Sequence, residues 1–286
     1  MLSNKRIAFI GSGMMAEAMI KGLLRKQHVG ADALVAAGPR AERGMALAEQ
    51  YGIEWTTDNQ QAAEGRDVVI LSVKPQVMAS VLHELRGTIR DGALIVSIAA
   101  GVPISMIADE LGHQAVTRAM PNTPGQIGEG ITVWTATGHV TEEQLSEAEM
   151  ILSAMGEVVQ VDNEHYLDMA TALSGTGPAY VLLFMEAMID AGVHLGFSRR
   201  VAQKLVMQTM RGTVEYARQS PRHPATLRNE VTSPGGTSAE ALYQLEKGGL
   251  RTVVSRAVWA AYQRSVALGK GTFSRRRGAG SDDETP

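Results

Sequence analysis

The stretch IAFIGSGMMAEAMIKGLL, residues 7–24, constrains the fold of this chain more than any other. Four apolar residues that predict a β-strand lead directly into Gly11, Gly13 and Ala16, and a helical pattern follows. In such a turn the first glycine allows a sharp bend, the second lets a phosphate approach the backbone, and the small third residue lets helix and strand touch. The stretch predicts the opening of a dinucleotide-binding domain; the alternative is a tight turn that binds no ligand.

Strands and helices alternate from Lys5 to about Asp162. Short apolar runs such as RIAFI, DVVILSV and ALIVSI are separated by helical stretches, for example 14–27 and 76–90. Runs that are apolar at consecutive positions are typical of strands covered on both faces of a parallel sheet. The alternation predicts an α/β domain over residues 1–162, a Rossmann-like doubly wound sheet that binds NADP.

The strands stop after about Asn163, and the remaining sequence predicts helices at 167–172, 178–195 and 198–218. Charged residues interrupt the apolar run PAYVLLFMEAMIDAGVHLG, which therefore predicts a buried helix and not a membrane span. So apolar a helical unit would leave a large exposed patch, and we expect it to pack against a second copy of itself. We predict an all-helical domain over 163–273 and a disordered tail over 274–286.

Composition narrows the class of protein. The 286 residues are 44% hydrophobic and 20% charged, which is typical of a soluble globular protein. The formal net charge of -3 gives no reason to expect a nucleic-acid partner. The sequence has no cysteine, which rules out disulfides and thiol chemistry, and MLSNKRIAFIGSG lacks the layout of a signal peptide. We expect a cytoplasmic protein with neither nucleic acid nor a membrane as partner.

The end of the second predicted strand indicates which dinucleotide would bind. An NAD site usually carries an acid there, about 20 residues past the glycines, to hold the ribose 2′-hydroxyl. Here the strand ALVAA is followed by Gly38, Pro39 and Arg40. A missing acid and a nearby arginine suit a 2′-phosphate and favour NADPH. NADH is the alternative, in which Arg40 is only a solvated residue at a helix start.

Two further loops, LSVKPQ and SIAAGVPI, follow predicted strands, at 72–75 and 99–101. Ligands of such sheets bind outside the carboxyl ends of the strands, so these loops should border the ribose and nicotinamide. Lys74 has the alternatives of capping a helix or staying solvated.

A second segment, VTSPGGTSAEAL at 231–242, also has the composition of an anion site. Small residues, adjacent glycines and hydroxyls precede a helical run. Such a turn exposes backbone N–H groups at a helix N-terminus, where partial positive charge favours an anion. An ordinary helix start without a ligand is the alternative.

Six segments together carry a resemblance to a known family. FIGSGMMA, VKPQ, SIAAGV, RAMPNTP, LSGTGPAYVLLFMEAMIDAGVHLG and VTSPGGTSAEALYQLEKGG occur in order along nearly the whole chain. The chain resembles the pyrroline-5-carboxylate reductases, which form proline by reducing a cyclic imine. The resemblance implies a Rossmann domain followed by an all-helical dimerisation domain, in a homodimer or a higher homo-oligomer. The active site would form where the cofactor domain of one protomer meets the helices of its partner.

The resemblance also assigns roles to residues. In the family the SPGGT loop holds the substrate carboxylate, and a hydroxyl at the position of Ser238 approaches the ring nitrogen. Asn59 matches a contact to the adenosine side of the cofactor. The predicted substrate contacts are Ser233, Gly235, Gly236, Thr237 and Ser238. The predicted cofactor contacts are Gly11, Ser12, Gly13, Met14, Met15, Arg40, Asn59, Ser72, Val73, Lys74, Pro75, Ala99, Ala100 and Gly101.

The chain departs from the family at four of its positions. Ser238 stands where relatives often have threonine, and Pro221 where some have an acid. Asn229 and Glu230 stand where relatives have aspartate and asparagine. Because a glutamate close to phosphates would be repulsive, Glu230 is not predicted to bind the cofactor.

Reduction of a C=N bond needs a close hydride donor, positive charge on the nitrogen and an anchor for the carboxylate. No histidine or acid stands inside a glycine or hydroxyl motif, so we predict catalysis by positioning, with Ser238 or Thr237 as donor or proton relay. Two alternative hypotheses are an NADPH-dependent reductase of another cyclic imine, such as piperideine carboxylate, and a catalytically silent NADP-binding protein. No metal is predicted: Glu186, Asp190 and His194 share a helical face, but a polar stripe is favoured over a metal site.

Overall fold

The computed structural model describes residues 2–277, and the side chains of residues 2–269. The chain divides into two compact units. Of the described residues, the first contains those up to Thr176 and those from Ala261 onward, and the second contains Gly177–Ala260. Of the predicted tail, residues 274–277 continue the last helix, and residues 278–286 lie outside the described part of the chain.

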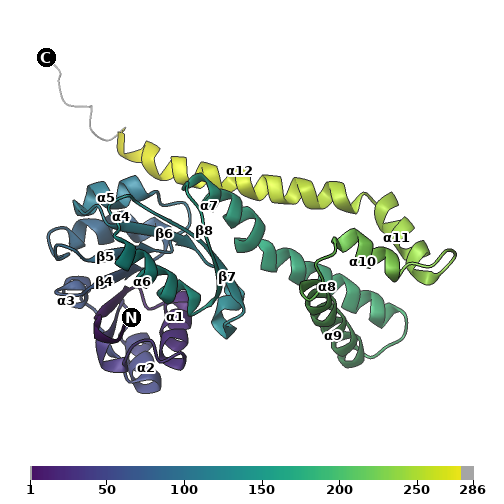
Figure 1. The fold of residues 1–286 in the computed structure, drawn as a ribbon, viewed down its shortest axis with the longest axis horizontal. Coiled ribbons are helices and arrows are strands. Elements are labelled where there is room, and N and C mark those ends of the chain that lie inside the picture. Colours follow the sequence, from purple (N-terminus) through teal and green to yellow (C-terminus); the bar gives the residue numbers. More distant parts are fainter. Residues whose placement is uncertain (1, 278–286) are drawn as a thin grey trace, which may run out of the picture. The chain divides into compact units, whose positions relative to one another are not determined.

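The first unit is built on one eight-stranded sheet with the order β3-β2-β1-β4-β5-β6-β7-β8 (Figure 1). Neighbouring strands are parallel except β6 and β7, which pair antiparallel. The strands are β1 (Ile7–Ile10), β2 (Leu34–Ala37), β3 (Glu54–Thr56), β4 (Val68–Leu71), β5 (Leu94–Ser97), β6 (Val116–Met120), β7 (Gly130–Ala136) and β8 (Gly156–Gln160). This order confirms the predicted Rossmann-like doubly wound sheet.

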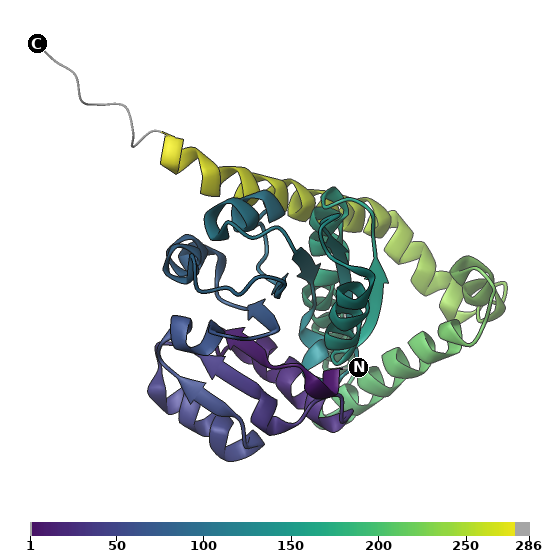
Figure 2. The same cartoon turned by 60° about the vertical axis from the view of Figure 1, so that its left-hand side comes forward.

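Helices cover both faces of the sheet (Figure 2). One core contains residues of α1 (Met14–Arg25), α2 (Ala41–Tyr51) and α6 (Glu142–Ser153). The other contains residues of α3 (Asn59–Ala63), α4 (Pro75–Leu85) and α5 (Ile104–Leu111). All four residues of β1, β2, β4 and β5 are buried, because each strand has a helix layer on either side.

The first unit is completed by α7 (His165–Ala170), a π-helical turn (Thr171–Gly175) and the end of α12 (Leu250–Arg277). Ser265 of α12 donates to the Asp168 carboxylate of α7 at 2.7 Å. Further along α12, Gly269 lies against Gly101, where an added Cβ would be 3.5 Å from the Gly269 nitrogen. The end of α12 therefore packs on a loop that the sequence assigns to the cofactor.

The start of β8 lies unusually close to β7. A Cβ added to Gly156 would lie 2.1 Å from the carbonyl oxygen of Gly130, the residue with which Gly156 pairs. Gly156 also has a φ of +138°, a conformation that side-chain-bearing residues rarely adopt. Only glycine therefore fits at the start of this strand pair.

The second unit is helical, as predicted. It consists of α8 (Gly177–His194), α9 (Arg199–Arg218), α10 (Pro224–Glu230), α11 (Thr237–Lys247) and the start of α12. Pro178 lies in the first turn of α8, where its missing N–H costs nothing.

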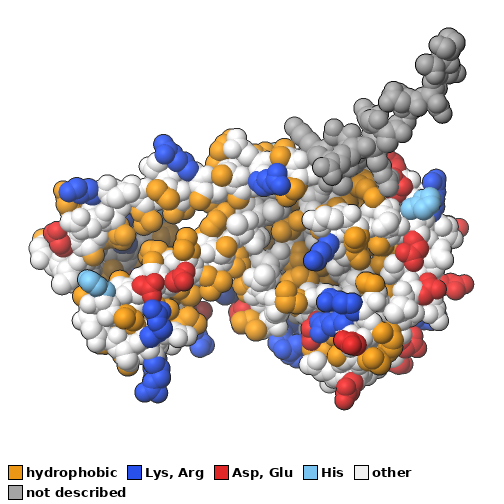
Figure 3. Space-filling view, turned by 180° about the vertical axis from the view of Figure 1, so that it is seen from behind, with side chains coloured by type: hydrophobic (Ala, Val, Ile, Leu, Met, Phe, Trp, Pro, Cys, Tyr) orange, Lys and Arg blue, Asp and Glu red, His pale blue; other side chains and the backbone are white. Residues whose placement is uncertain are grey.

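The prediction that the apolar helix at 178–195 is buried is wrong within this chain. No residue of α8 is buried, and Leu182, Leu183 and Phe184 are among its exposed side chains. Hydrophobic side chains are visible at the surface in Figure 3. By length and composition alone, the helical stretch His165–His194 is apolar enough to span a membrane. Because the apolar side chains of α8 are exposed within one chain, we expect another protein surface to bury them.

Candidate active site

The glycine-rich turn follows β1 and closes against the end of β4. Gly11 has a φ of +106°, and its N–H donates to the carbonyl of Ala37 at 2.9 Å. The Ser72 hydroxyl donates to the Gly11 carbonyl at 2.7 Å. A Cβ added to Gly11 would lie 2.8 Å from the backbone of Ser72 and Val73. The turn is therefore packed tightly against the next strand of the sheet.

Gly13 is built differently from Gly11. It is the N-cap of α1, no side chain caps it, and a Cβ added there would meet no atom within 4 Å. The N-terminus of α1 is therefore open, which suits a phosphate bound by backbone N–H groups. Met14, the next residue, is exposed and Met15 is half-buried.

The predicted cofactor loops meet at one edge because β1, β2, β4 and β5 run parallel. The strand order reverses beside β1, and ligands of such sheets bind at this point. Residues 72–75 follow β4 and residues 99–101 follow β5 on the same edge. Lys74 is the N-cap of α4, but its exposed side chain makes no capping bond, so the capping alternative does not hold.

Arg40 and Asn59 follow β2 and β3 at the same edge. Arg40 is the exposed N-cap residue of α2. Asn59 opens α3, and its side-chain amide donates to the Glu84 carboxylate at 2.9 Å. This bond uses one N–H of the amide, so a cofactor contact could use the other N–H or the amide oxygen. Both residues stay predicted contacts.

The predicted substrate contacts lie together in the second unit, at the start of α11. Gly236 is the N-cap of this helix, and no side chain satisfies the first N–H groups. Gly235 has a φ of +70°, and the Gly236 N–H donates to the Ser233 carbonyl at 3.0 Å. Thr237 and Ser238 are the first two helical residues. The loop therefore presents backbone N–H groups and hydroxyls at a helix start, the arrangement that the sequence predicts.

Glu230 precedes this loop, and its side chain contacts α9 and the segment between α9 and α10. It forms an ion pair with Arg222 and accepts a hydrogen bond from the Tyr216 hydroxyl at 3.1 Å. Its charge is thus balanced locally, which gives a physical reason why an acid is tolerated here. Sequence reasoning missed this pairing because Tyr216 and Arg222 carry no recognisable motif.

The polar stripe on α8 contains an ion pair. Asp190, one of three residues on the polar face of α8, pairs with Arg199 at 2.9 Å. Within the described residues, no three His, Cys, Asp or Glu side chains are grouped so that they could hold a metal ion.

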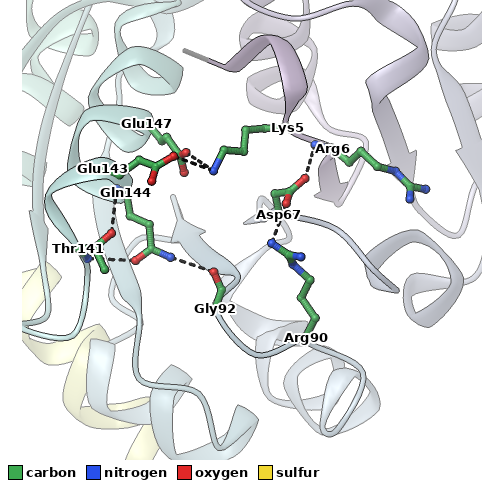
Figure 4. A network of polar contacts seen from close by, with 9 residues as sticks. All are labelled: Lys5, Arg6, Asp67, Arg90, Gly92, Thr141, Glu143, Gln144 and Glu147. Atoms are coloured by element: carbon green, nitrogen blue, oxygen red, sulfur yellow. Dashed lines mark hydrogen bonds and ion pairs between the residues drawn. The ribbon is translucent and has the colours of Figure 1, made fainter.

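A polar cavity of about 410 Å³ lies at the opposite edge of the sheet, beside the amino ends of the strands. Figure 4 shows its network of polar contacts. Lys5 contacts the carboxylates of Glu147 at 2.6 Å and Glu143 at 3.2 Å. Asp67 accepts hydrogen bonds from the Arg6 N–H and from Arg90, both at 2.7 Å. Because these charged groups are paired with one another, we interpret the network as structural.

Lys5→Met is expected to lower the free energy of unfolding by roughly 1–3 kcal/mol at neutral pH, because it leaves Glu147, only 4% exposed, without its counter-ion. The Glu147 contact outweighs burial and raises the pKa of Lys5 above 10.5. The contribution of this pKa shift is therefore complete below that pH and is lost as the pH rises through the raised value. Urea unfolding of wild type and Lys5→Met at neutral and strongly alkaline pH measures both effects. Equal losses in Lys5→Met and in Lys21→Met, which removes an exposed lysine of α1, would contradict this interpretation.

The carboxyl edge of the sheet differs from the amino edge, where charged residues pair with one another. Its loops are rich in small residues, its first turn meets the end of β4, and its helix start is open. A sheet of this order with such a turn defines the first unit as a dinucleotide-binding domain of the Rossmann type.

Comparisons with known proteins identify the family. A family model described as NADP oxidoreductase, coenzyme F420-dependent, matches residues 6–101, and one described as pyrroline-5-carboxylate reductase dimerisation matches residues 164–268. The chain is 42% identical to the pyrroline-5-carboxylate reductases of Synechocystis sp. and of Pseudomonas aeruginosa, and each match covers 93% of this chain and 98% of the relative. The chain belongs to the pyrroline-5-carboxylate reductase family.

Solved structures agree with the sequence matches. The pyrroline-5-carboxylate reductase of Coxiella burnetii has a TM-score of 0.86 at 35% identity. The pyrroline carboxylate reductase of Plasmodium falciparum, solved with NADP bound, has a TM-score of 0.85 at 32% identity. Each match covers 93% of this chain and 99% of the other. The fold class, the dinucleotide cofactor and the resemblance inferred from the sequence are thereby confirmed, while the individual contact residues stay predictions.

Proposed function

We propose that this protein reduces the C=N bond of 1-pyrroline-5-carboxylate to give L-proline, the last step of proline biosynthesis. The observation that carries the proposal is the loop before α11, whose glycine N-cap leaves backbone N–H groups without a capping side chain. This loop belongs to a chain whose relatives are named for this reaction. A small carboxylate is the class of anion that such a helix start can hold.

The substrate carboxylate would be held by the main chain of the second unit. An anion at a helix N-terminus gains up to about 2 kcal/mol in a partly buried site. Each hydrogen bond to its charge adds about 1.5–3 kcal/mol. The uncapped N–H groups of Thr237 and Ser238, with the hydroxyl of Ser233, would be the donors to this carboxylate. Together they can bind a small metabolite without an arginine.

The cofactor would be held at the carboxyl edge of the sheet by the open start of α1, and when bound it supplies the hydride. The absence of an acid after β2 and the exposed Arg40 favour NADPH, with NADH as the alternative. A cyclic imine is basic enough to arrive protonated, so the protein needs no strong acid. The Ser238 or Thr237 hydroxyl would hold the proton at the ring nitrogen.

Ser238→Ala is expected to lower kcat about ten- to hundredfold, the loss that follows from removing one hydrogen bond to a charged group. Steady-state kinetics with the cyclic imine and saturating NADPH measures the effect. Ser238→Thr keeps the hydroxyl and should retain most of the activity. An unchanged kcat in Ser238→Ala, with normal affinity for the imine, would remove Ser238 from the mechanism.

The experiment that tests the function compares substrates and cofactors side by side. Loss of the reduced-nicotinamide absorbance is followed with pyrroline-5-carboxylate, piperideine-2-carboxylate and small keto acids, each with NADPH and with NADH. The proposal predicts the highest kcat/KM for pyrroline-5-carboxylate with NADPH. A higher value for piperideine-2-carboxylate would indicate a reductase of another cyclic imine. Cofactor binding without turnover of any substrate would indicate a catalytically silent protein.

We further propose that the protein acts in the cytoplasm as a homodimer or a higher homo-oligomer. The match of residues 164–268 to a dimerisation domain supports this assembly. So does a groove of about 680 Å³ on α8 and α9, lined by apolar side chains that include Leu182, Leu183 and Met207. Light scattering of the purified full chain should give at least twice the monomer mass.

A further inference from the structure

The helix that follows β2 reaches back to the glycine-rich turn through one side chain, Arg43. Its Nε donates to the backbone carbonyl of Ser12 at 3.1 Å, in the middle of the turn. Its Nη2 forms an ion pair with Glu17 of α1. Glu17 also accepts a hydrogen bond from the hydroxyl of Tyr51, at the end of α2, at 2.9 Å. Arg43 is thus held at one side by Glu17 and itself holds the turn at the other.

The pair between Arg43 and Glu17 is partly shielded from water. The exposed fractions of the two side chains are 28% and 24%. Burial alone raises the pKa of Glu17, but hydrogen bonds from Arg43 and Tyr51 outweigh it, so the pKa lies below its usual value. Burial and the bond to Glu17 raise the pKa of Tyr51. At neutral pH the pair is therefore charged and the tyrosine still donates.

The Arg43 bond fixes the orientation of one peptide group. Because a peptide is planar and trans, the carbonyl of Ser12 and the N–H of Gly13 point in opposite directions. Fixing the carbonyl toward Arg43 therefore turns the Gly13 N–H away from it. Gly13 has no side chain, so this peptide lacks the restraint that a Cβ at this position would provide. The open N-terminus of α1 lies at this same glycine.

The neighbours of Ser12 leave little room for adjustment. A Cβ added to Gly38, which follows β2, would lie 2.6 Å from the Ser12 hydroxyl. Gly11, on the other side of Ser12, packs against the end of β4. Ser12 itself is buried. A small displacement of the turn would therefore disturb the ends of both neighbouring strands.

We propose that Arg43 is a positioning residue that holds the Ser12–Gly13 peptide with its N–H presented to the diphosphate of the cofactor. Glu17 and Tyr51 hold Arg43 in turn. The proposal rests on the proposed cofactor site at the start of α1. Since NADPH and NADH share the diphosphate, this role concerns both cofactors equally. Arg40 differs, because a contact to the 2′-phosphate would concern NADPH alone.

The test compares Arg43→Met with the matched variant Arg40→Met. We expect Arg43→Met to raise KM and Kd about tenfold for both NADPH and NADH, by the same factor, with kcat at saturating cofactor within about twofold of wild type. Arg40→Met should weaken NADPH binding and leave NADH unchanged. Cofactor Kd is measured by fluorescence titration and KM by imine reduction. Arg43→Lys, which can still donate one hydrogen bond, should recover part of the loss.

Each other outcome has a defined meaning. A loss confined to NADPH in Arg43→Met would overturn the proposal and place Arg43 at the 2′-phosphate. Unchanged Kd values with a lowered Tm would also overturn it, since Arg43 would then serve stability alone. If Arg43→Met does not fold, Tyr51→Phe replaces it in the test. This variant must weaken the binding of NADPH and of NADH by the same factor, and by less than the loss expected for Arg43→Met. If wild type binds both cofactors but reduces no imine, the proposed function fails while the Kd values still decide the role of Arg43.

Discussion

Replacing Gly11 by alanine is expected to raise the KM for NADPH and for NADH about a hundredfold, and to lower the Tm. A methyl group at this position would lie 2.8 Å from the backbone of Ser72 and Val73, so the turn must move away from β4. The residue would also adopt a φ of +106°, a strain of about 1–3 kcal/mol. The two effects act together on the turn that carries the start of α1. Cofactor titration and thermal unfolding measure them separately.

Gly13→Ala provides the control for this prediction. At Gly13 the φ is -78° and an added Cβ meets no atom within 4 Å, so the variant should fold with the stability of wild type. Its cofactor affinity should still fall, because the methyl group would occupy the space through which a phosphate approaches. Wild-type affinity in Gly11→Ala would show that the close fit against β4 has no part in cofactor binding.

Gly156→Ala is expected to destabilise the protein by about 3 kcal/mol or more, the largest loss of stability among the variants considered. The added Cβ would lie 2.1 Å from the Gly130 carbonyl oxygen and 2.6 Å from its nitrogen. Both atoms belong to the backbone of β7, so relief requires the first pair of β7 and β8 to separate. Urea unfolding followed by circular dichroism gives the change in free energy.

Gly65→Ala separates backbone strain from this collision. Gly65 has a φ of +66°, but a Cβ added there meets no atom within 4 Å. Its replacement should therefore cost only the strain of a left-handed residue, about 1–2 kcal/mol. Similar losses in Gly65→Ala and Gly156→Ala would mean that β7 and β8 can adjust freely, contrary to the prediction.

Much of the first unit could be predicted because its signals are local. Buried strands such as β4 consist of consecutive apolar residues, and the glycine turn announces the helix that follows it. The sequence pattern missed β3 and β6. β3 has three residues, lies at the edge of the sheet and is partly exposed, so it carries no apolar run. In β6 the buried residues Thr117 and Arg118 interrupt the pattern.

The reason that Arg118 can be buried lies far away in the sequence. It pairs with Glu164 at 2.5 Å, a residue that follows the whole sheet and precedes α7. The bond between Arg43 and Ser12 is of the same kind, because it depends on how α2 packs beside the turn. The loop before α11 was predictable because glycines and hydroxyls at a helix start are a local signal. Contacts between distant segments leave no such local trace.

The exposed apolar face of α8 shows a further limit of sequence patterns. Periodicity identifies an apolar helix face that must be buried, but it does not say whether the same chain or another chain buries it. Here α8 has no buried residue within the chain, and the prediction of a buried helix failed for that reason.

The uncapped start of α11 has a consequence for how this enzyme should be mapped by mutagenesis. An alanine scan removes side chains. It would hardly affect binding through backbone N–H groups, because nearly every residue has one. Saturating libraries should instead show their sharpest intolerance at the residues with nothing to remove, such as Gly235 and Gly236. In such a map the residues predicted to bind the substrate through their backbone would stand out as positions that tolerate no added side chain.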